Sequence, residues 1–301
     1  MTISRAQLAK ELEPGLNALF GLEYDRYENE AAEIFESEGS DRAFEEEVML
    51  SGFGTAPVKT EGSAINFDDA QEAYTARYTM ETIALAFSIT EEAVEDNLYD
   101  RLAARYTRAL ARSMAQTKQI KGATVLNNAF LATSPIGDGA ALCSAAHPSL
   151  SGNQRNLLET PADLNETSLE DILIQIAGFT DERGLKIAVR GTKLLIPKEL
   201  QFIAERIINS NLRPGTADND INAMKSMGML PEGAAVNHFF TDADAYFVKT
   251  DCPNGFKLFN RTPLKTAMEG DFDTGNMRFK ARERYAFGVS DWRCVYGTPG
   301  A

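Results

Sequence analysis

The fold of this chain is decided by residues 74–121, which read YTARYTMETIALAFSI over 74–89 and TEEAVEDNLYDRLAARYTRALARSMAQTKQIK over 90–121. The first part alternates, because residues 74, 76, 78 and 80 are apolar and those between them are polar. Alternation with a period of two predicts a strand with one apolar and one polar face. The apolar positions then change to 83, 85, 87 and 89, which predicts a twist or bulge near Thr82.

The second part of this stretch has the period of a helix. Residues 90–121 contain neither Gly nor Pro, so an unbroken helix would be roughly 48 Å long at about 1.5 Å per residue. Ser88 or Thr90 can cap it, and acidic residues follow in the first turns, where the helix dipole favours them. A strand joined without a loop to so long a helix suits a protein that extends across space and is held by neighbours.

Four arginines follow one face of the predicted helix. Arg101, Arg105, Arg108 and Arg112 are spaced by four, three and four residues, and no acid lies three or four positions from any of them. This arginine stripe is either a solvated face without a specific partner or a surface that meets phosphates or an acidic segment.

Acidic residues dominate the charge of the chain. The formal net charge of −14 argues against a dedicated nucleic-acid binder, but it suits a container that does not adhere to DNA. Eleven carboxylates lie between Glu23 and Glu47, opposed only by Arg26 and Arg42. The apolar positions 31, 34 and 35 have helical spacing. The segment therefore has two interpretations, a solvated helix face or an arm that seeks a basic partner.

Residues 53–88 are predicted to form a long hairpin. A second strand over residues 58–67 would accompany the strand that begins at Tyr74, with turns at residues 61–63 and 68–69. The hairpin has too few large apolar residues to bury itself, and an isolated two-stranded ribbon is marginally stable in water. It therefore needs another surface, either in its own domain or on another subunit.

The remaining patterns mix helices and strands. Residues 3–20 are predicted to be helical with a kink or break at Pro14, and Thr167 with Glu170 forms a capping box for a second helix. Pro197 opens a further helix through Ile208. Strands are predicted at residues 194–196, 245–249, 257–260, 264–268, 277–289 and 292–296, the fifth of which alternates basic and apolar residues. Segregated helices and antiparallel strands predict an α+β fold.

Motifs of chemistry are sparse, so we expect no enzymatic activity, no cofactor and no metal site. Glycine-rich phosphate loops, a nucleophile elbow and an HExxH pair are absent. The weak candidates are Cys143 with His147, and the carboxylates Asp271 and Asp273. Three cysteines cannot all pair with one another, and without a signal peptide we expect reduced thiols. No apolar run approaches the ~20 residues of a membrane span.

The order of the parts carries a family resemblance. An arm, a long hairpin, a long helix and an α+β body follow one another, and matching residues are spread over most of the chain. They are KTEG (59–62), INFD (65–68), FSITEE (87–92), ED (95–96), LARS (110–113), AHP (146–148), DADAYF (242–247), DFDT (271–274), DWR (291–293) and YG (296–297). The chain resembles the major capsid proteins of tailed bacteriophages, which have the Hong Kong 97-type fold, and most of all the Mu-like major head subunits.

The resemblance implies an N-terminal arm at residues 1–50 and an extended hairpin loop at 51–88. It implies a peripheral domain with the long spine helix at 89–187 and 271–301, and an axial domain at 188–270. Such proteins assemble with themselves as hexamers and pentamers into an icosahedral shell that encloses double-stranded DNA. They need no cofactor and contact no membrane. Portal, scaffold or decoration proteins are further partners, and the location is the virion, after assembly in the host cytoplasm.

The hypothesis for the assembly interface names the basic residues of the loop and of the spine helix. They are Lys59, Arg77, Arg101, Arg105, Arg108 and Arg112. Some relatives join a lysine to an asparagine covalently, and Lys59 lies in the corresponding region. An encapsulin-like nanocompartment shell protein is the alternative with the same fold. A cytosolic enzyme that uses Cys143 and His147, or the Asp271 and Asp273 pair, is the alternative of another class.

Overall fold

The structure is a computed structural model that describes residues 5–90, 92, 99–213, 220–271 and 274–301, with side chains described from Pro14 onward except those of 99–102. The helices are α1 (Arg5–Tyr24), α3 (Tyr99–Asn127), α4 (Glu166–Ala177), α5 (Gln201–Asn209) and α6 (Ala223–Ser226), with 3-10 turns η1 (Glu30–Glu33), η2 (Lys198–Leu200) and η3 (Trp292–Cys294). The strands are β1 (Glu36–Gly39), β2 (Phe44–Leu50), β3 (Glu72–Thr79), β4 (Glu81–Ile89), β5 (Gly191–Pro197), β6 (Ala234–Asn237), β7 (Tyr246–Thr250), β8 (Phe256–Gly270), β9 (Met277–Val289) and β10 (Val295–Thr298). The predicted α+β fold is confirmed.

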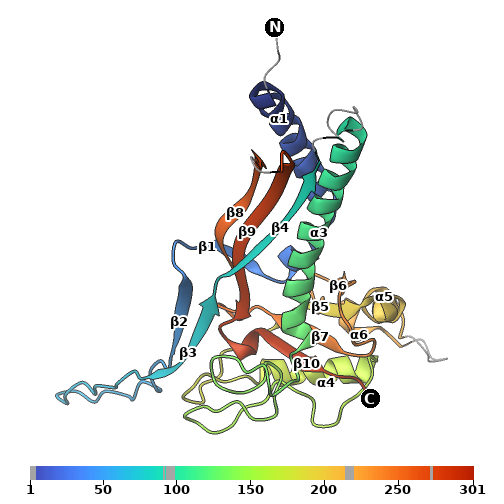
Figure 1. Ribbon diagram of the computed structural model, residues 1–301. Coiled ribbons are helices and arrows are strands. Elements are labelled where there is room, and N and C mark those ends of the chain that lie inside the picture. The colour runs from blue at the N-terminus through green and yellow to red at the C-terminus, as the bar shows by residue number, and fades with distance from the viewer. Residues whose placement is uncertain (1–4, 91, 93–98, 214–219, 272–273) are drawn as a thin grey trace.

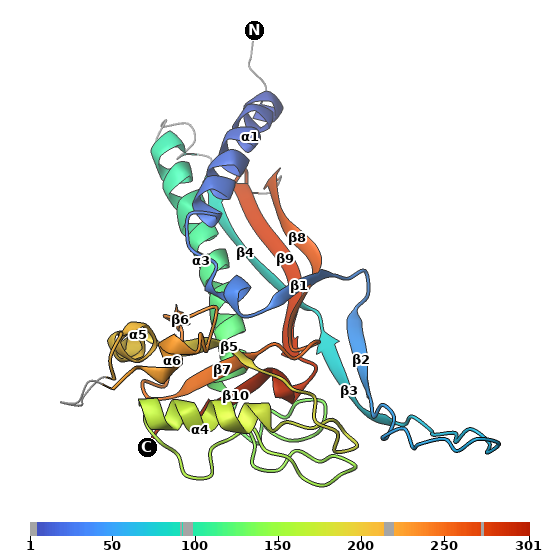
Figure 2. The ribbon, with the colours of Figure 1, turned by 180° about the vertical axis from the view of Figure 1, so that it is seen from behind.

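The long sheet has the strand order β1-β8-β9-β4. β9 pairs antiparallel with β8 and with β4, and β1 pairs in parallel with the other edge of β8. Alternate residues of β9 point to one side, where Phe279 and Ala281 are buried with Leu16 of α1 and with Leu110 and Met114 of α3. The helices α1 and α3 therefore lie side by side over one face of the sheet (Figures 1 and 2).

The second sheet, of order β10-β7-β5-β6, forms the compact end of the molecule with α4 and α5. Leu194 and Ile196 of β5 are buried with Ile172 and Ile176 of α4. Helix α4 is capped by Asn165, whose side chain accepts from Ser168 N, so the predicted cap at Thr167 was wrong. Asn165 is the cap because its side-chain carbonyl oxygen accepts a hydrogen bond from a backbone N–H of the first turn that has no partner within the helix.

The predicted hairpin exists only in part. β3 pairs antiparallel with β2, not with residues 58–67, which form no strand. β4 leaves this two-stranded ribbon and pairs with β9 in the long sheet. The predicted twist or bulge near Thr82 was wrong, because β4 pairs in continuous register through Thr82. The chain is instead broken into two strands at Met80, a buried residue whose backbone N–H donates to Ala43 O at 3.2 Å. The change of apolar positions thus marks a change of sheet, because each strand turns its apolar side toward a different partner.

The spine helix is longer at its C-terminal end than predicted. Helix α3 continues past Lys121 to Asn127 and passes through Gly122. A Cβ at Gly122 would lie 3.0 Å from the Cβ of Ala31, so this glycine allows the segment after α1 to pack closely on the helix. The predicted start at Thr90 cannot be compared, because residues 91 and 93–98 lie outside the described part. Helix α1 likewise runs beyond the predicted residue 20 and contains Pro14.

The acidic segment is not the continuous helix that its spacing suggested. It forms the short turn η1 and the strands β1 and β2. Ala31, Ile34 and Phe35 are buried, but against Leu126, Phe256 and other residues of the body. The pattern was correct about burial and wrong about the element, since a short apolar cluster fits one helical turn as well as several.

Two other strand predictions need correction. Residues 257–260 and 264–268 belong to the single strand β8, whose register shifts around Pro263. Proline lacks the N–H that a ladder needs, so it disturbs the pairing without ending the strand. Residues 292–296 begin with η3 before β10 continues in the second sheet. The strand at residues 277–289 is confirmed with its predicted bounds as β9.

A buried carboxylate lies where α1, α3 and β9 meet. Glu283 of β9 accepts a hydrogen bond from Tyr24 Oη at 3.3 Å, and Lys118 Nζ of α3 lies 3.6 Å away. Burial raises the pKa of Glu283, and the attraction of Lys118 only partly offsets it. The ionised form of Glu283 therefore lowers the free energy of unfolding relative to its neutral form.

We expect Glu283→Gln to gain stability relative to the wild type as the pH rises. A folded-state pKa above the ordinary 4.5 gives a contribution that is fully present below that pH and is lost as the pH rises through the raised value. The neutral amide has no such loss. The difference in Tm between variant and wild type should therefore grow as the pH rises from 4.5 through the raised pKa of Glu283. The matched control is Glu81→Gln. Glu81 is an exposed carboxylate that pairs with Lys121 of α3, the helix that also carries Lys118. A constant difference for Glu283→Gln would contradict the buried-charge assignment.

Candidate assembly surface

Residues 51–71, here named the tip segment, extend away from both sheets beyond the β2–β3 ribbon (Figures 1 and 2). Residues 55–71 are all exposed. Val58 is 95% exposed and Phe67 is 97% exposed, although both side chains are apolar. Apolar groups gain free energy when another surface removes them from water. The tip segment therefore has the character of a surface that a partner covers.

The base of the tip segment is held in place by its own subunit. Gly54 N donates to the Asp68 carboxylate at 2.7 Å, and Arg183 pairs with the same carboxylate at 3.2 Å. The contacts lower the pKa of Asp68, chiefly through the Gly54 N–H and also through Arg183. Ser51 and Gln71 close the base, because Ser51 N donates to Gln71 O at 2.8 Å. The exposed end is thus presented from a defined root.

A second set of contacts, here named the hairpin anchor, fixes the β2–β3 ribbon to the long sheet. Lys257 of β8 is only 5% exposed and pairs with Glu38 of β1 at 3.1 Å and with Glu47 of β2. Ser290 donates to Glu47 and is hydrogen-bonded to Tyr78 of β3. Burial alone would lower the pKa of Lys257, but the hydrogen bonds and charges of Glu47 and Glu38 outweigh it and raise the pKa. The lysine therefore stays charged and joins three strands.

Close packing of Tyr78 on the backbone of β9 completes the base of the β2–β3 ribbon. Tyr78 packs edge-on against Phe259 at 4.8 Å between ring centroids. A Cβ at Gly288 would lie 2.5 Å from Cε1 of Tyr78, so only glycine admits this ring. The contacts place β3 across the end of β9, from which the ribbon leaves the body.

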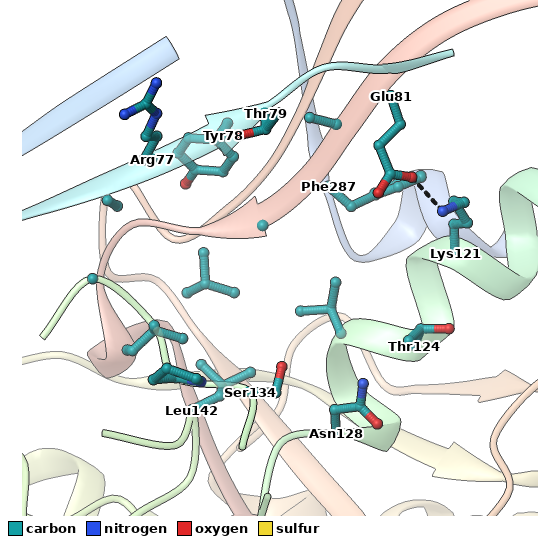
Figure 3. A pocket seen from close by; sticks show the side chains of 18 of the residues that line it. Arg77, Tyr78, Thr79, Glu81, Lys121, Thr124, Asn128, Ser134, Leu142 and Phe287 are labelled. Carbon is teal, nitrogen blue, oxygen red and sulfur yellow. Dashed lines mark hydrogen bonds and ion pairs between the residues drawn. The ribbon is translucent and has the colours of Figure 1, made fainter. Parts of the chain in front are cut away.

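A cavity of about 660 Å³ lies between this root and the lower half of α3. Figure 3 shows Tyr78 and Thr79 on one side, and Thr124 of α3 with Asn128, just beyond the helix, on the other. An ion pair between Lys121 and Glu81 crosses at one end. The ion pair ties α3 to the first residue of β4. The charged residues that line the cavity already have partners, because Glu81 pairs with Lys121 and Arg77 pairs with Glu46.

The structure does not bring the predicted interface residues together. Lys59 is exposed in the tip segment, whereas Arg77 lies on β3, 3.7 Å from the Glu46 carboxylate and 4.1 Å from the Phe44 ring centroid. Arg105 and Arg108 are exposed on α3 and have no ion pair within the described part of the chain. The other two members of the arginine stripe are Arg112, which has a partner, and Arg101. Arg112 donates to Tyr27 Oη at 2.9 Å, and the side chain of Arg101 lies outside the described residues.

The acidic segment finds many basic partners within its own subunit. Besides the hairpin anchor, Glu33 lies 3.7 Å from Lys193, and Glu30 lies 2.6 Å from His238 Nδ1. These contacts tie η1, β1 and β2 to the second sheet and to β8. The acidic segment therefore binds mainly to its own subunit and holds η1, β1 and β2 against the two sheets.

The residues considered for catalysis have structural surroundings. Cys143 is buried, which raises the pKa of its thiol and opposes a thiolate nucleophile. His147 is buried between Asp138 at 2.6 Å and Asn156 at 3.0 Å and stacks on Trp292. Asp271 pairs with Arg278, and Asp273 lies outside the described residues.

Among the described residues, no group of three or more His, Cys, Asp or Glu side chains is placed to hold a metal ion. None of the described helices is both long and apolar enough to cross a lipid bilayer.

Comparison with known families decides the identity of this architecture. The sequence profile of a family described as phage capsid protein matches residues 72–297, well over half of the chain. The chain belongs to the phage capsid protein family. It is thus a structural protein of the virion, and the capsid resemblance seen in the sequence is confirmed. The finer likeness to Mu-like head subunits stays a prediction. No curated protein sequence matches the chain.

Solved capsids share the fold of this capsid protein. A capsid chain of a native GTA particle has a TM-score of 0.56 at 12% identity and covers 91% of this chain and 92% of its own. A chain of Mycobacterium phage Adephagia has a TM-score of 0.55 at 13% identity and covers 91% of each chain. A virus-like particle from Pyrococcus furiosus has a TM-score of 0.54 at 8% identity and covers 94% of this chain and 97% of its own. The predicted Hong Kong 97-type fold is confirmed.

Sequence reasoning missed the residues that hold the hairpin. Lys257 and Ser290 carry no motif, and Glu47 is one of many acids in its segment. Arg183 lies in a loop far from Asp68 in the chain. The only sequence signal was indirect, since a hairpin without its own core needs contacts elsewhere.

We expect Lys257→Met to loosen the ribbon. The change leaves Glu38 and Glu47 without their shared cation, which should cost about 1–3 kcal/mol, less than for a fully buried pair because both carboxylates keep some solvent. Hydrogen exchange in β2 and β3 should become faster. Lys193→Met removes another cation that two carboxylates share, Glu33 and Glu232, and should leave exchange in the ribbon unchanged. Equal exchange in both variants would refute the anchor.

Proposed function

We propose that this chain is the major capsid protein of a tailed phage and assembles as hexamers and pentamers into an icosahedral shell around double-stranded DNA. The observation that carries this proposal is the tip segment. It extends from a rigid root, and its apolar side chains Val58 and Phe67 are covered by nothing in their own subunit. A neighbouring copy is the partner that a closed shell supplies at every position.

The proposed regions follow the expected order of a capsid subunit. Residues 1–50 form an N-terminal arm and 51–88 the extended hairpin loop. A peripheral domain is proposed at residues 89–187 and 271–301, and an axial domain at 188–270. The axial domain so bounded would separate β8 from β9, which pair along their whole length. We therefore propose to end the axial domain before Phe256, so that both strands belong to the peripheral domain.

The interface proposal concerns the basic residues of the spine helix and of the hairpin, of which Arg105 and Arg108 form no ion pair among the described residues. Arg105 and Arg108 are exposed, while many acids of the N-terminal segment already have partners. We propose that Arg105 and Arg108, with Arg101 and Arg112, face a neighbouring subunit, and that Lys59 and Arg77 do so from the hairpin. Portal, scaffold or decoration proteins remain further proposed partners, with assembly in the host cytoplasm.

A nanocompartment shell protein would present the same fold. The likeness to the virus-like particle from Pyrococcus furiosus concerns the fold alone and does not separate the two functions. Electron microscopy of purified particles, with a measurement of nuclease-protected DNA, separates the two functions. Shells that protect phage-length DNA support the proposal, and shells that hold only proteins contradict it.

We expect Val58→Asp with Phe67→Asp to abolish shells without unfolding the subunit. Both side chains are almost fully exposed, so the monomer loses no core contact, whereas a covered interface would have to bury two charges. Negative-stain microscopy and a thermal melt measure the two effects. Val58→Leu with Phe67→Leu keeps the apolar character and is the control that should still assemble. Normal shells from the aspartate variant would contradict the role of the tip segment.

We expect Arg105→Glu with Arg108→Glu to lower particle yield while the Tm of the subunit stays within about 1 °C of the wild type, since exposed substitutions usually change stability by less than about 0.5 kcal/mol. Lys198→Glu with Arg206→Glu, an equal change of charge on η2 and α5, is the matched control. Undiminished yields from the α3 variant would remove Arg105 and Arg108 from the interface.

A further inference from the structure

A buried histidine beneath the hairpin has a role that the proposed function leaves unexplained. His147 is fully buried, and the ring of Trp292 stacks on it with 4.4 Å between the ring centroids. Nδ1 of the imidazole lies 2.6 Å from the Asp138 carboxylate, whose side chain is also buried. Nε2 lies 3.0 Å from Oδ1 of Asn156. Both ring nitrogens thus face oxygen atoms away from solvent.

The neighbours of Asn156 fix which end of its amide meets the ring. Nδ2 donates to three backbone carbonyls, those of Leu142 at 2.7 Å, Trp292 at 3.2 Å and Val295 at 3.1 Å. Oδ1 accepts from Ser144 N at 2.8 Å. Turning the amide over would place its oxygen against three carbonyl oxygens. Nε2 of the imidazole therefore faces an acceptor.

Two acceptors on opposite sides of the ring require two donors. A neutral imidazole carries one N–H, so its other nitrogen would direct a lone pair at an oxygen lone pair. An imidazolium donates from both nitrogens and forms a charge-assisted hydrogen bond with the Asp138 carboxylate. The hydrogen-bond geometry therefore calls for a doubly protonated ring at His147.

Charged groups from three further segments surround this pair. Arg293 pairs with Glu182 of the loop after α4 at 2.9 Å and with Asp291 at 3.2 Å. Burial chiefly raises the pKa of Tyr74 on β3, and the carboxylates of this cluster raise it further, although Arg293 opposes them. With Asp138, three carboxylates are opposed by one guanidinium and by the second proton of the imidazole.

We propose that Asp138, His147 and Asn156 form a proton-dependent latch, with the imidazolium form of His147 as its closed state. The latch holds the base of the hairpin, because Gly137 lies directly against β3. A Cβ at Gly137 would be 2.9 Å from Tyr74 Cδ2. Loss of the ring proton to solvent would leave a buried carboxylate without its cation and would loosen the loop on which β3 rests.

A second route links the latch to the tip segment. His147 and Gln154 exchange backbone hydrogen bonds at 2.7 and 2.9 Å, and the Gln154 side chain donates to Asp181 O at 3.0 Å. Arg183, two residues further along the chain, pairs with Asp68 of the tip segment. The direction in which the hairpin leaves the subunit therefore depends on the latch through two sets of contacts, all within one subunit.

The first test measures the protonation of the ring in the unaltered chain. The chain has two histidines, His147 and His238, so labelling histidine with nitrogen-15 gives two sets of ring signals in the NMR spectrum of the subunit. His238→Gln assigns them. We expect both ring nitrogens of His147 to carry protons at neutral pH. One protonated and one bare nitrogen would overturn the inference.

Asp138→Asn removes the need for the second proton. Its amide oxygen can accept from Ala140 N, as Asp138 Oδ1 does at 2.9 Å, and its NH2 group can donate to a bare Nδ1. An unfolded histidine loses its proton between about pH 5 and about pH 8, whereas the folded latch retains it, so the stability of the wild type falls as the pH rises. Relative to the variant, its ratio of folded to unfolded chains should fall by up to about tenfold per pH unit. A difference that stays constant over this range would contradict the latch.

Hydrogen exchange locates the effect in the hairpin. At the alkaline end of the range, and in the same buffer, exchange in β3 should be faster in the wild type than in Asp138→Asn, while exchange in α5 should be equal. His238→Gln removes an exposed histidine that also pairs with a carboxylate, Glu30, and should exchange in β3 as the wild type does. Equal exchange in β3 of the wild type and Asp138→Asn would overturn the inference. The proposed function stands in either case, because none of these measurements concerns shells.

Discussion

Burial of one side of β9 is the constraint on which the rest of the structure depends. Phe279 and Ala281 can leave water only if α1 and α3 lie across the same face, so the length of the strand sets the length of helix that covers it. The strict alternation that buries this side puts Arg282 and its neighbours on the other. One strand thus defines a core for the subunit and a charged strip for its surroundings.

At the junction between β3 and β4 the chain passes from a ribbon that extends away from the body into the long sheet. β4 is held by β9, whereas β3, after the break at Met80, pairs only with β2. A two-stranded ribbon is weak by itself, so Lys257 with two carboxylates and Tyr78 above Gly288 supply the missing support at its base. The far end has no such support and keeps apolar side chains in water.

Charge is divided between the inside and the outside of the subunit. Three of the eight acids of residues 30–47, Glu33, Glu38 and Glu47, are intramolecular partners of lysines in the two sheets. Arg105 and Arg108 of α3 and Lys280 of β9 are left at the surface instead. A capsid subunit with a net charge of −14 can therefore present local positive surfaces, because its negative charge is concentrated elsewhere.

The local periods of strands and helices could be read from the sequence alone. The alternation of residues 74–80, its change near Thr82, the helical run before Lys121 and the strand at 277–289 were all readable, and with them the α+β class and the capsid family resemblance. Strand partners were not readable, because backbone hydrogen bonds are the same for any pair and the choice depends on residues far apart in the chain. Only the tertiary structure decided that β3 pairs with β2, that β4 joins β9, and that Lys257 meets Glu47 across more than two hundred residues of chain. The alternation of Arg278, Lys280, Arg282 and Arg284 was visible in the sequence, but the residues beside them depend on the pairing of β9 with β4 and β8.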